Sequence, residues 1–95
     1  MNPIIDRCAG LDVHQATVMA TIRMPAEGGS RRSITEEFST TTVGSLTLRD
    51  WLQAHGVTHV AMESTGVYWK PVYYVLEDGF SLLLEQSATE RVTRG

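Results

Sequence analysis

Residues 8–24 read "CAGLDVHQATVMATIRM" and place a single carboxylate, Asp12, in an otherwise apolar run. From residue 17 onward, apolar side chains alternate with Thr, Met and Arg, which is the two-residue period of a β-strand. Residues 8–14 are small and apolar without clean alternation, which is typical of a central strand covered on both faces. A buried carboxylate without a partner costs several kcal/mol, so Asp12 requires a partner, a metal ion or an exposed position at a strand end.

A third strand is predicted over residues 33–40, downstream of this run. The tripeptide "HQA" between the first two strands fits a tight hairpin, and "PAEGGSRR" at 25–32 is a turn cluster of Pro, Gly and Ser. The polar mixture in "SITEEFST" suits an edge strand. We therefore expect an antiparallel meander of three strands. For Arg31 and Arg32, a solvated hairpin flank is favoured over a phosphate clamp, which is the alternative.

A helix is predicted over residues 41–56, because four of its side chains recur at positions i, i+3, i+4 and i+7 of one face. These side chains are Leu48, Trp51, Leu52 and His55. Gly56 is the expected C-terminal stop. The apolar run at 57–63 begins directly after it and ends at Glu63, so the helix is a crossover into a strand that is parallel to its neighbour.

A second helix is predicted to begin close to Val67, because Pro71 is tolerated only near the first turn. Ser64 or Thr65 is the expected N-cap, and Gly79 closes the helix. Residues 80–84, "FSLLL", predict a final buried strand. The polar tail at 85–95 shows no periodicity and is expected to fray.

These elements predict a mixed α/β fold with a five-stranded sheet in the order 3-2-1-4-5 and two crossover helices. In that order the first and fourth strands are parallel neighbours, so Asp12 and Glu63 emerge at the same edge of the sheet. Two carboxylates about 4 Å apart repel each other by roughly 4 kcal/mol at an effective dielectric constant of about 20. Such a pair either shares a proton or holds a cation, and oxygen ligands suit Mg²⁺ or Mn²⁺.

Composition sets the wider limits. Ninety-five residues form one small domain, and no apolar run is long enough to cross a bilayer, so we expect no membrane segment. The N-terminal residues do not read as a secretory signal, so we expect a cytoplasmic protein. The formal net charge of −3 argues against nucleic-acid binding through a basic field of the chain itself. A bound metal ion would supply the missing positive charge. The single cysteine, Cys8, is expected to be a small buried strand residue.

The segments "GLDVHQATVMATI" and "AMESTGVYWKPVYYVLEDGF" resemble the N-terminal domain of the DEDD transposases of bridge-RNA-guided insertion sequences. These are site-specific DNA recombinases with a Holliday-junction-resolvase-like domain and a ribonuclease-H-like fold. The resemblance covers residues 9–84. It implies that Asp12 and Glu63 are the first two acidic residues of the DEDD tetrad, catalytic and metal-binding, with Mg²⁺ or Mn²⁺ as cofactor. It also implies DNA, a guide RNA and other copies of the chain as partners.

This sequence departs from the family pattern after "SLLL". The family carries its other two aspartates downstream in a basic stretch, followed by a domain with a nucleophilic serine. We therefore expect residues 1–84 to be a truncated DEDD domain that binds Mg²⁺ weakly and is inactive alone. If it did nick DNA, another acidic residue such as Glu85 or Glu90 would have to complete the site.

Four further residues are candidate nucleic-acid contacts. His14 follows Asp12 closely, Tyr68 and Trp69 could stack on unpaired bases, and Lys70 could meet a phosphate. For one of the two aromatic residues, packing is at least as strong an alternative. The histidines lack metal-ligand spacing.

Two other functions stay open. The chain could be a noncatalytic remnant that associates with itself or with a full-length recombinase. It could also be a fragment of an actin-like ATPase or sugar kinase, although the phosphate hairpin of that superfamily normally carries a glycine soon after its aspartate, where this chain has "VHQ".

Overall fold

The computed structural model describes residues 7–86 and confirms the predicted sheet, with strand order β3-β2-β1-β4-β5. β1 pairs antiparallel with β2 and parallel with β4, β2 pairs antiparallel with β3, and β4 pairs parallel with β5. The elements are β1 (Cys8–Val13), β2 (Thr17–Pro25), a 3-10 turn (Glu27–Gly29), β3 (Arg31–Ser39), α1 (Thr42–Ala54), β4 (His59–Ser64), α2 (Trp69–Leu76) and β5 (Ser81–Gln86).

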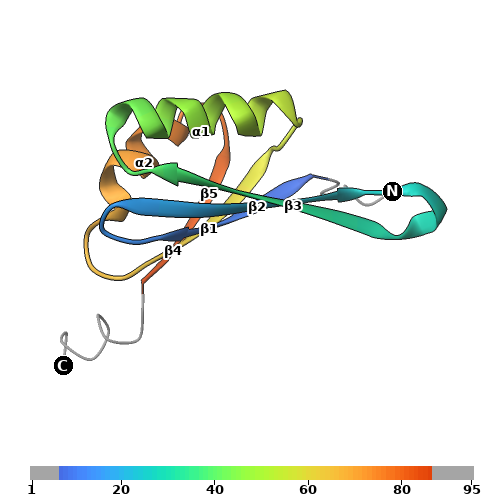
Figure 1. The fold of residues 1–95 in the computed structure, drawn as a ribbon, viewed down its shortest axis with the longest axis horizontal. Coiled ribbons are helices and arrows are strands. Elements are labelled where there is room, and N and C mark those ends of the chain that lie inside the picture. The colour runs from blue at the N-terminus through green and yellow to red at the C-terminus, as the bar shows by residue number, and fades with distance from the viewer. Residues whose placement is uncertain (1–6, 87–95) are drawn as a thin grey trace.

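Both helices lie on the same face of the sheet (Figure 1). The core forms between them and the sheet, from alternate strand residues such as Leu11, Ile22 and Met62, which are almost fully buried. The intervening residues of these strands lie on the opposite face, which we call the open face, and are exposed or half-buried. Residues 7–86 thus cover β1 on one face only, so the prediction of cover on both faces was wrong. The open-face positions of β1 include Gly10, which hides the alternation because it has no side chain.

Cys8 also differs from its prediction. It is half-buried, because its position in the alternation of β1 is an open-face position. Its register partners are Arg23 on β2 and His59 on β4. The only cysteine of the chain is therefore accessible from the open face.

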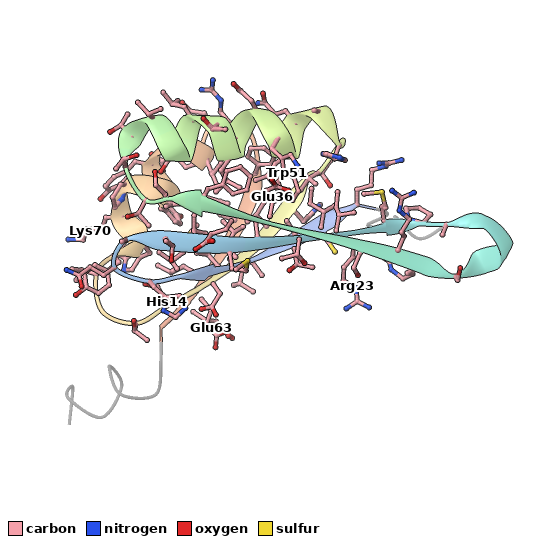
Figure 2. The ribbon with its side chains drawn as sticks, viewed as in Figure 1. His14, Arg23, Glu36, Trp51, Glu63 and Lys70 are labelled. Carbon is pink, nitrogen blue, oxygen red and sulfur yellow. The ribbon has the colours of Figure 1, made fainter. Side chains whose placement is uncertain are left out.

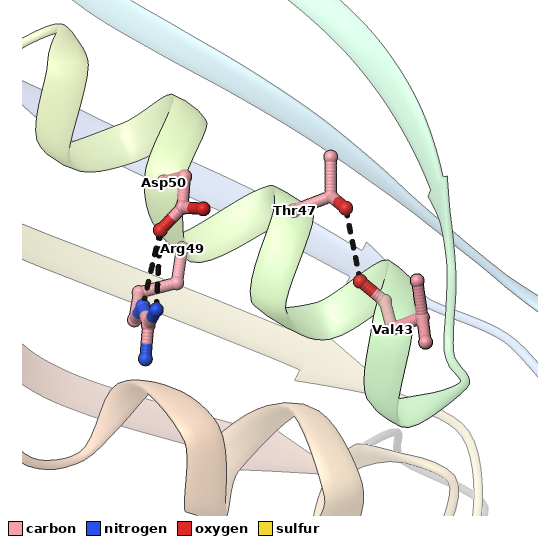
Figure 3. A network of polar contacts seen from close by, with 4 residues as sticks. All are labelled: Val43, Thr47, Arg49 and Asp50. Atoms are coloured by element: carbon pink, nitrogen blue, oxygen red, sulfur yellow. Dashed lines mark hydrogen bonds and ion pairs between the residues drawn. The ribbon is translucent and has the colours of Figure 1, made fainter.

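α1 begins after Thr41, whose side-chain oxygen accepts a hydrogen bond of 3.0 Å from the backbone N–H of Gly44. The face that it buries is centred on Leu48 and Leu52, as predicted, while Trp51 and His55 lie half-buried at its border. On the polar side, the guanidinium of Arg49 contacts the Asp50 carboxylate at 3.2 Å, and the Thr47 hydroxyl donates to the carbonyl of Val43 at 2.9 Å (Figure 3). Gly56, with φ of 72°, follows the helix as predicted.

α2 begins at Trp69 with Pro71 in its first turn, so the prediction of a start near Val67 is close. The prediction that Ser64 or Thr65 caps this helix was wrong. Ser64 is the buried last residue of β4, and the helix follows Tyr68 without a side-chain cap. A turn with Gly66 at φ of 70° separates β4 from α2, so Ser64 and Thr65 lie in the strand end and the turn and not at the start of the helix.

β5 is an edge strand within the described range, not the buried strand predicted over 80–84. Leu82 and Leu84 pack against the core, but Leu83 points to the open face and is 61% exposed. The strand also includes Glu85 and continues to Gln86, two residues past the predicted domain end. The rest of the predicted tail, 87–95, lies outside the described residues.

The β2–β3 hairpin is the longest feature of the sheet, with nine residues in each strand. Its distal half extends beyond the helices (Figure 1). Arg31 and Arg32 begin β3 beside the tip and are exposed, as expected for a hairpin flank. Neither α1 nor α2 is long and apolar enough to cross a membrane, within the part of the chain that is described.

Candidate functional site

Asp12 and Glu63 are direct register partners in the parallel pair of β1 and β4. Each precedes the last residue of its strand, and each is exposed on the open face. Neighbouring strands lie about 4.8 Å apart, so the two side chains leave the sheet side by side. They therefore project from the open face near the carboxyl ends of the strands. This exposed position also explains how Asp12 exists in an apolar run.

The row of carboxylates extends to a third strand. Glu85 on β5 is the register partner of Glu63, and it is exposed on the same face. We call Asp12, Glu63 and Glu85 the acidic row. On the other side of Asp12 the register continues to Met19 on β2 and then to Glu37 on β3, an exposed carboxylate on the same face that Met19 separates from Asp12. The sequence places Glu85 beside Glu63 only once β4 and β5 are known to be parallel neighbours, because the alignment of the two residues follows from the register of these strands.

A shallow hollow on the open face is lined by the acidic row. Gly10 and Ala61, each two positions before an acidic residue, form its floor, and Met19 and Leu83 stand at its sides. A Cβ atom placed on Gly10 would meet nothing within 4 Å. The spacing small residue, apolar residue, acidic residue occurs in both β1 and β4. It leaves the space beside the carboxylates accessible to a ligand.

His14 contacts Asp12 but is not among the residues that line the hollow. Its Nε2 is 3.3 Å from Oδ2 of Asp12, and both side chains are more than half exposed. The backbone N–H of His14 donates to the carbonyl of Thr17 at 2.8 Å and closes the β1–β2 hairpin. Figure 2 shows His14 and Glu63 on the side of the sheet away from the helices. The position of His14 is therefore set by the backbone, and its imidazole can orient Asp12.

Tyr68, Trp69 and Lys70 do not line the hollow. Trp69 is half-buried and packs against the core, with its ring centroid 5.5 Å from that of Tyr73. Tyr68 is 38% exposed. Lys70 is exposed, with Nζ 6.0 Å from the Trp69 ring centroid, and points outward from one end of the molecule (Figure 2). Packing against the core thus explains the position of Trp69, while the side chains of Tyr68 and Lys70 are accessible to solvent outside the hollow.

The donor atoms fit a magnesium-type ion only in part. Mg²⁺ is commonly held by one or two carboxylates and keeps several water or phosphate ligands, which Asp12 and Glu63 could supply and leave room for. Among residues 7–86, no group of three or more His, Cys, Asp or Glu side chains is placed to hold a metal ion. The pair therefore suits an open site that shares its ion with a substrate.

The family model described as Transposase, for the DEDD transposases of the IS110 type, matches residues 9–89. The chain belongs to this DEDD transposase family. The match confirms the resemblance stated above and extends five residues beyond its predicted end at 84. No curated protein matches the chain.

Solved structures share the fold of this DEDD transposase domain. RuvC of Thermus thermophilus superposes with a TM-score of 0.60 at 13% identity, over 84% of this chain and 63% of that one. Fowlpox virus resolvase, in complex with Holliday junction DNA, superposes with a TM-score of 0.59 at 13% identity, over 93% of this chain and 69% of that one. The Aquifex aeolicus member of the Ppx/GppA family superposes with a TM-score of 0.60 at 13% identity, over 90% of this chain and 36% of that one. The transposase chain thus spans about a third of the Ppx/GppA protein, and the ribonuclease-H-like fold is confirmed.

Proposed function

We propose that this chain is the part of a transposase catalytic domain that supplies Asp12 and Glu63 to a divalent-metal site for DNA strand cleavage and transfer. The observation that carries the proposal is the register of β1 and β4, which aligns the two carboxylates on an open face. It does so in a chain that belongs to the DEDD transposases. The proposed cofactor is Mg²⁺ or Mn²⁺.

The proposed chemistry divides between the ion and the protein. A bound ion would supply Lewis acidity for phosphodiester cleavage. Asp12 and Glu63 would hold it, and His14, 3.3 Å from Asp12, would orient that carboxylate. The floor of Gly10 and Ala61 leaves space for a phosphate group to approach. DNA is the proposed substrate, and guide RNA and further copies of the chain are proposed partners of the family.

Activity of the chain alone is not part of this proposal. In-line phosphodiester cleavage requires cations on both the attacking and the leaving oxygen. Two aligned carboxylates are a small ligand set for that purpose, and Glu85 is the nearest further carboxylate by register. We therefore expect weak metal binding and no cleavage by the chain alone.

Metal binding is tested by titrating the purified chain with Mn²⁺, by calorimetry and by the paramagnetic relaxation of water protons. Asp12→Asn and Glu63→Gln are each expected to weaken binding at least tenfold, because each removes a ligand from a pair. Asp50→Asn is the matched control, since Asp50 is an exposed carboxylate on α1. Equal affinity of all four proteins would contradict the proposed site.

Cleavage is tested with Mn²⁺ and branched or supercoiled DNA. We expect no nicking by the wild-type chain. Nicking that disappears in Asp12→Ala would show that the site is complete, and Glu85→Gln would then test whether Glu85 is the additional ligand. Glu90, the other candidate, lies outside the described residues.

A further inference from the structure

The open face carries arginines as well as carboxylates. In the antiparallel pair of β2 and β3, Arg23 is aligned with Ser33, and Pro25 with Arg31. Directly aligned residues share a face, so Arg23 and Arg31 lie on the open face with Met19, the register partner of Asp12. Figure 2 shows Arg23 on the same side of the sheet as Glu63 and His14, away from the helices.

Arg23 has no acidic partner in the described part of the chain. It is exposed, and its register neighbours Cys8 and Ser33 are uncharged. Two arginines elsewhere in the fold differ from Arg23: Arg49 pairs with Asp50, and Nη1 of Arg7 donates to the carbonyl of His55 at 2.9 Å. The guanidinium of Arg23 is therefore available to a ligand.

The spacing between Arg23 and the acidic row follows from the strand geometry. Arg23 is four residues from Met19 along β2, or about 13 Å at roughly 3.3 Å per residue. Arg31, aligned with Pro25, is about 20 Å along the same direction. Between the two arginines and the acidic row lies a row of uncharged open-face residues, which includes Thr21 and Gly10. A chain of phosphates could cross this uncharged strip from the acidic row to the hairpin.

We propose that Arg23 and Arg31 form a phosphate-binding arm, which holds the DNA strand several nucleotides away from the acidic row. The proposal rests on the proposed function, because it takes DNA as the substrate. The chain has a net charge of −3, and its acidic row repels phosphates in the absence of metal, so DNA requires cations elsewhere on the same face. Arginine suits this role, since its guanidinium can bind a phosphate through two hydrogen bonds.

The arm is a paired hairpin, so its geometry is fixed before DNA binds. Thr21 and Thr35, aligned on the open face, are joined by a hydroxyl–hydroxyl hydrogen bond of 3.0 Å. Thr21 is two residues from Arg23 along β2, the next position on the same face of the strand. The positively charged end and the acidic row are thus parts of one continuous sheet, which sets the path of the strand relative to the metal site.

The first test measures DNA binding of the full chain by fluorescence anisotropy, with labelled branched DNA at several salt concentrations. Arg23→Gln and Arg31→Gln are each expected to weaken binding and to reduce the slope of log affinity against log salt by about one. Arg49→Gln is the matched control, because Arg49 lies on α1 and its pair with Asp50 is partly exposed. It should leave the slope unchanged.

The second test uses the single cysteine of the chain, which lies beside Arg23 in the register of β1 and β2. DNA that carries a disulfide-activated tether on its backbone is expected to crosslink to Cys8, and Arg23→Gln should reduce the yield. Cys8→Ser is the control for attachment elsewhere. Tethers placed at successive nucleotides should give a maximum crosslinking yield at one position, and equal yields at all positions would contradict a fixed path of the DNA strand past Arg23.

The outcomes separate this inference from the proposed function. If the wild-type chain binds DNA and metal but neither arginine variant changes the salt slope, the arm is wrong and the proposed function stands. If the wild-type chain binds no DNA, both are overturned. If Arg23→Gln disrupts a dimer in light scattering while DNA affinity stays the same, the arm contacts a second copy of the chain, and the DNA assignment fails.

Discussion

Asp12 and Glu63 each lie one residue before the end of a strand, and the parallel ladder sets the distance between their Cα atoms. His14 contacts Asp12, but within residues 7–86 no cation pairs with Glu63. The two carboxylates are exposed, so water and salt screen their repulsion well below the roughly 4 kcal/mol expected at an effective dielectric constant of about 20. The sequence predicted the pair but overestimated its cost, because it could not show which face was open.

Glu63→Gln is expected to change the free energy of unfolding by less than about 1 kcal/mol, or to raise it slightly without metal, because it removes a screened repulsion. Chemical denaturation measures this difference. Met62→Ala is the matched control in the same strand. Met62 is buried, and its truncation should cost about 2–5 kcal/mol. A loss above about 3 kcal/mol for Glu63→Gln would instead identify Glu63 as a structural ion-pair partner.

The start of α1 lies close to the end of β3, the edge strand that precedes it. A Cβ atom on Gly44, in the first turn of α1, would collide with the side chain and backbone of Ser39 at the end of β3. Beside it, the hydroxyl of Ser45 is buried and has no hydrogen-bond partner within the described range. Small residues here allow the helix to lie close to the strand that precedes it.

Gly44→Ala is expected to destabilise the protein by about 1–3 kcal/mol through overpacking, although alanine favours a helix by about 1 kcal/mol over glycine. The midpoint of thermal unfolding measures the effect. Ser45→Ala is the matched control and should be neutral or stabilising, because it removes a buried unpaired hydroxyl. A stabilised Gly44→Ala protein would show that α1 can move away from Ser39.

The elements that were predicted correctly have strong local signals. The alternation in β2 and the stop at Gly56 are each decided within a few residues. The errors are non-local: exposure of β1 and β5 depends on which face the helices cover. The sequence around Ser64 gave a capping signal that the strand and the following turn used instead. Glu85 was named only as a candidate, since its alignment requires the register of β5.

The molecule as a whole has one covered and one open sheet face within residues 7–86 (Figure 1). Apolar side chains on the open face include Met19, 42% exposed, and Leu83, 61% exposed. Leu83 lies on β5, an edge strand whose outer backbone groups could pair with another chain. This exposed apolar surface favours self-association, which is the behaviour expected of the noncatalytic remnant.

We expect the purified chain to self-associate at high concentration and Leu83→Ser to raise the concentration at which the dimer dissociates several-fold. Sedimentation equilibrium measures both. Leu46→Ser is the matched control, because Leu46 is a partly exposed leucine on α1. If the wild-type chain stays monomeric at millimolar concentration, the exposed surface does not drive association by itself.

Gly10 lies in a strand, and nothing within 4 Å would obstruct a side chain there. Glycine inside a strand costs roughly 0.5–1 kcal/mol relative to alanine, so folding alone gives no reason to retain it. A variant with alanine or serine at this position would be more abundant in the cell, yet it would partly fill the floor beside Asp12. Selection for protein abundance and selection for transposition would therefore favour different residues at position 10, and a library scored in both ways would separate the two pressures.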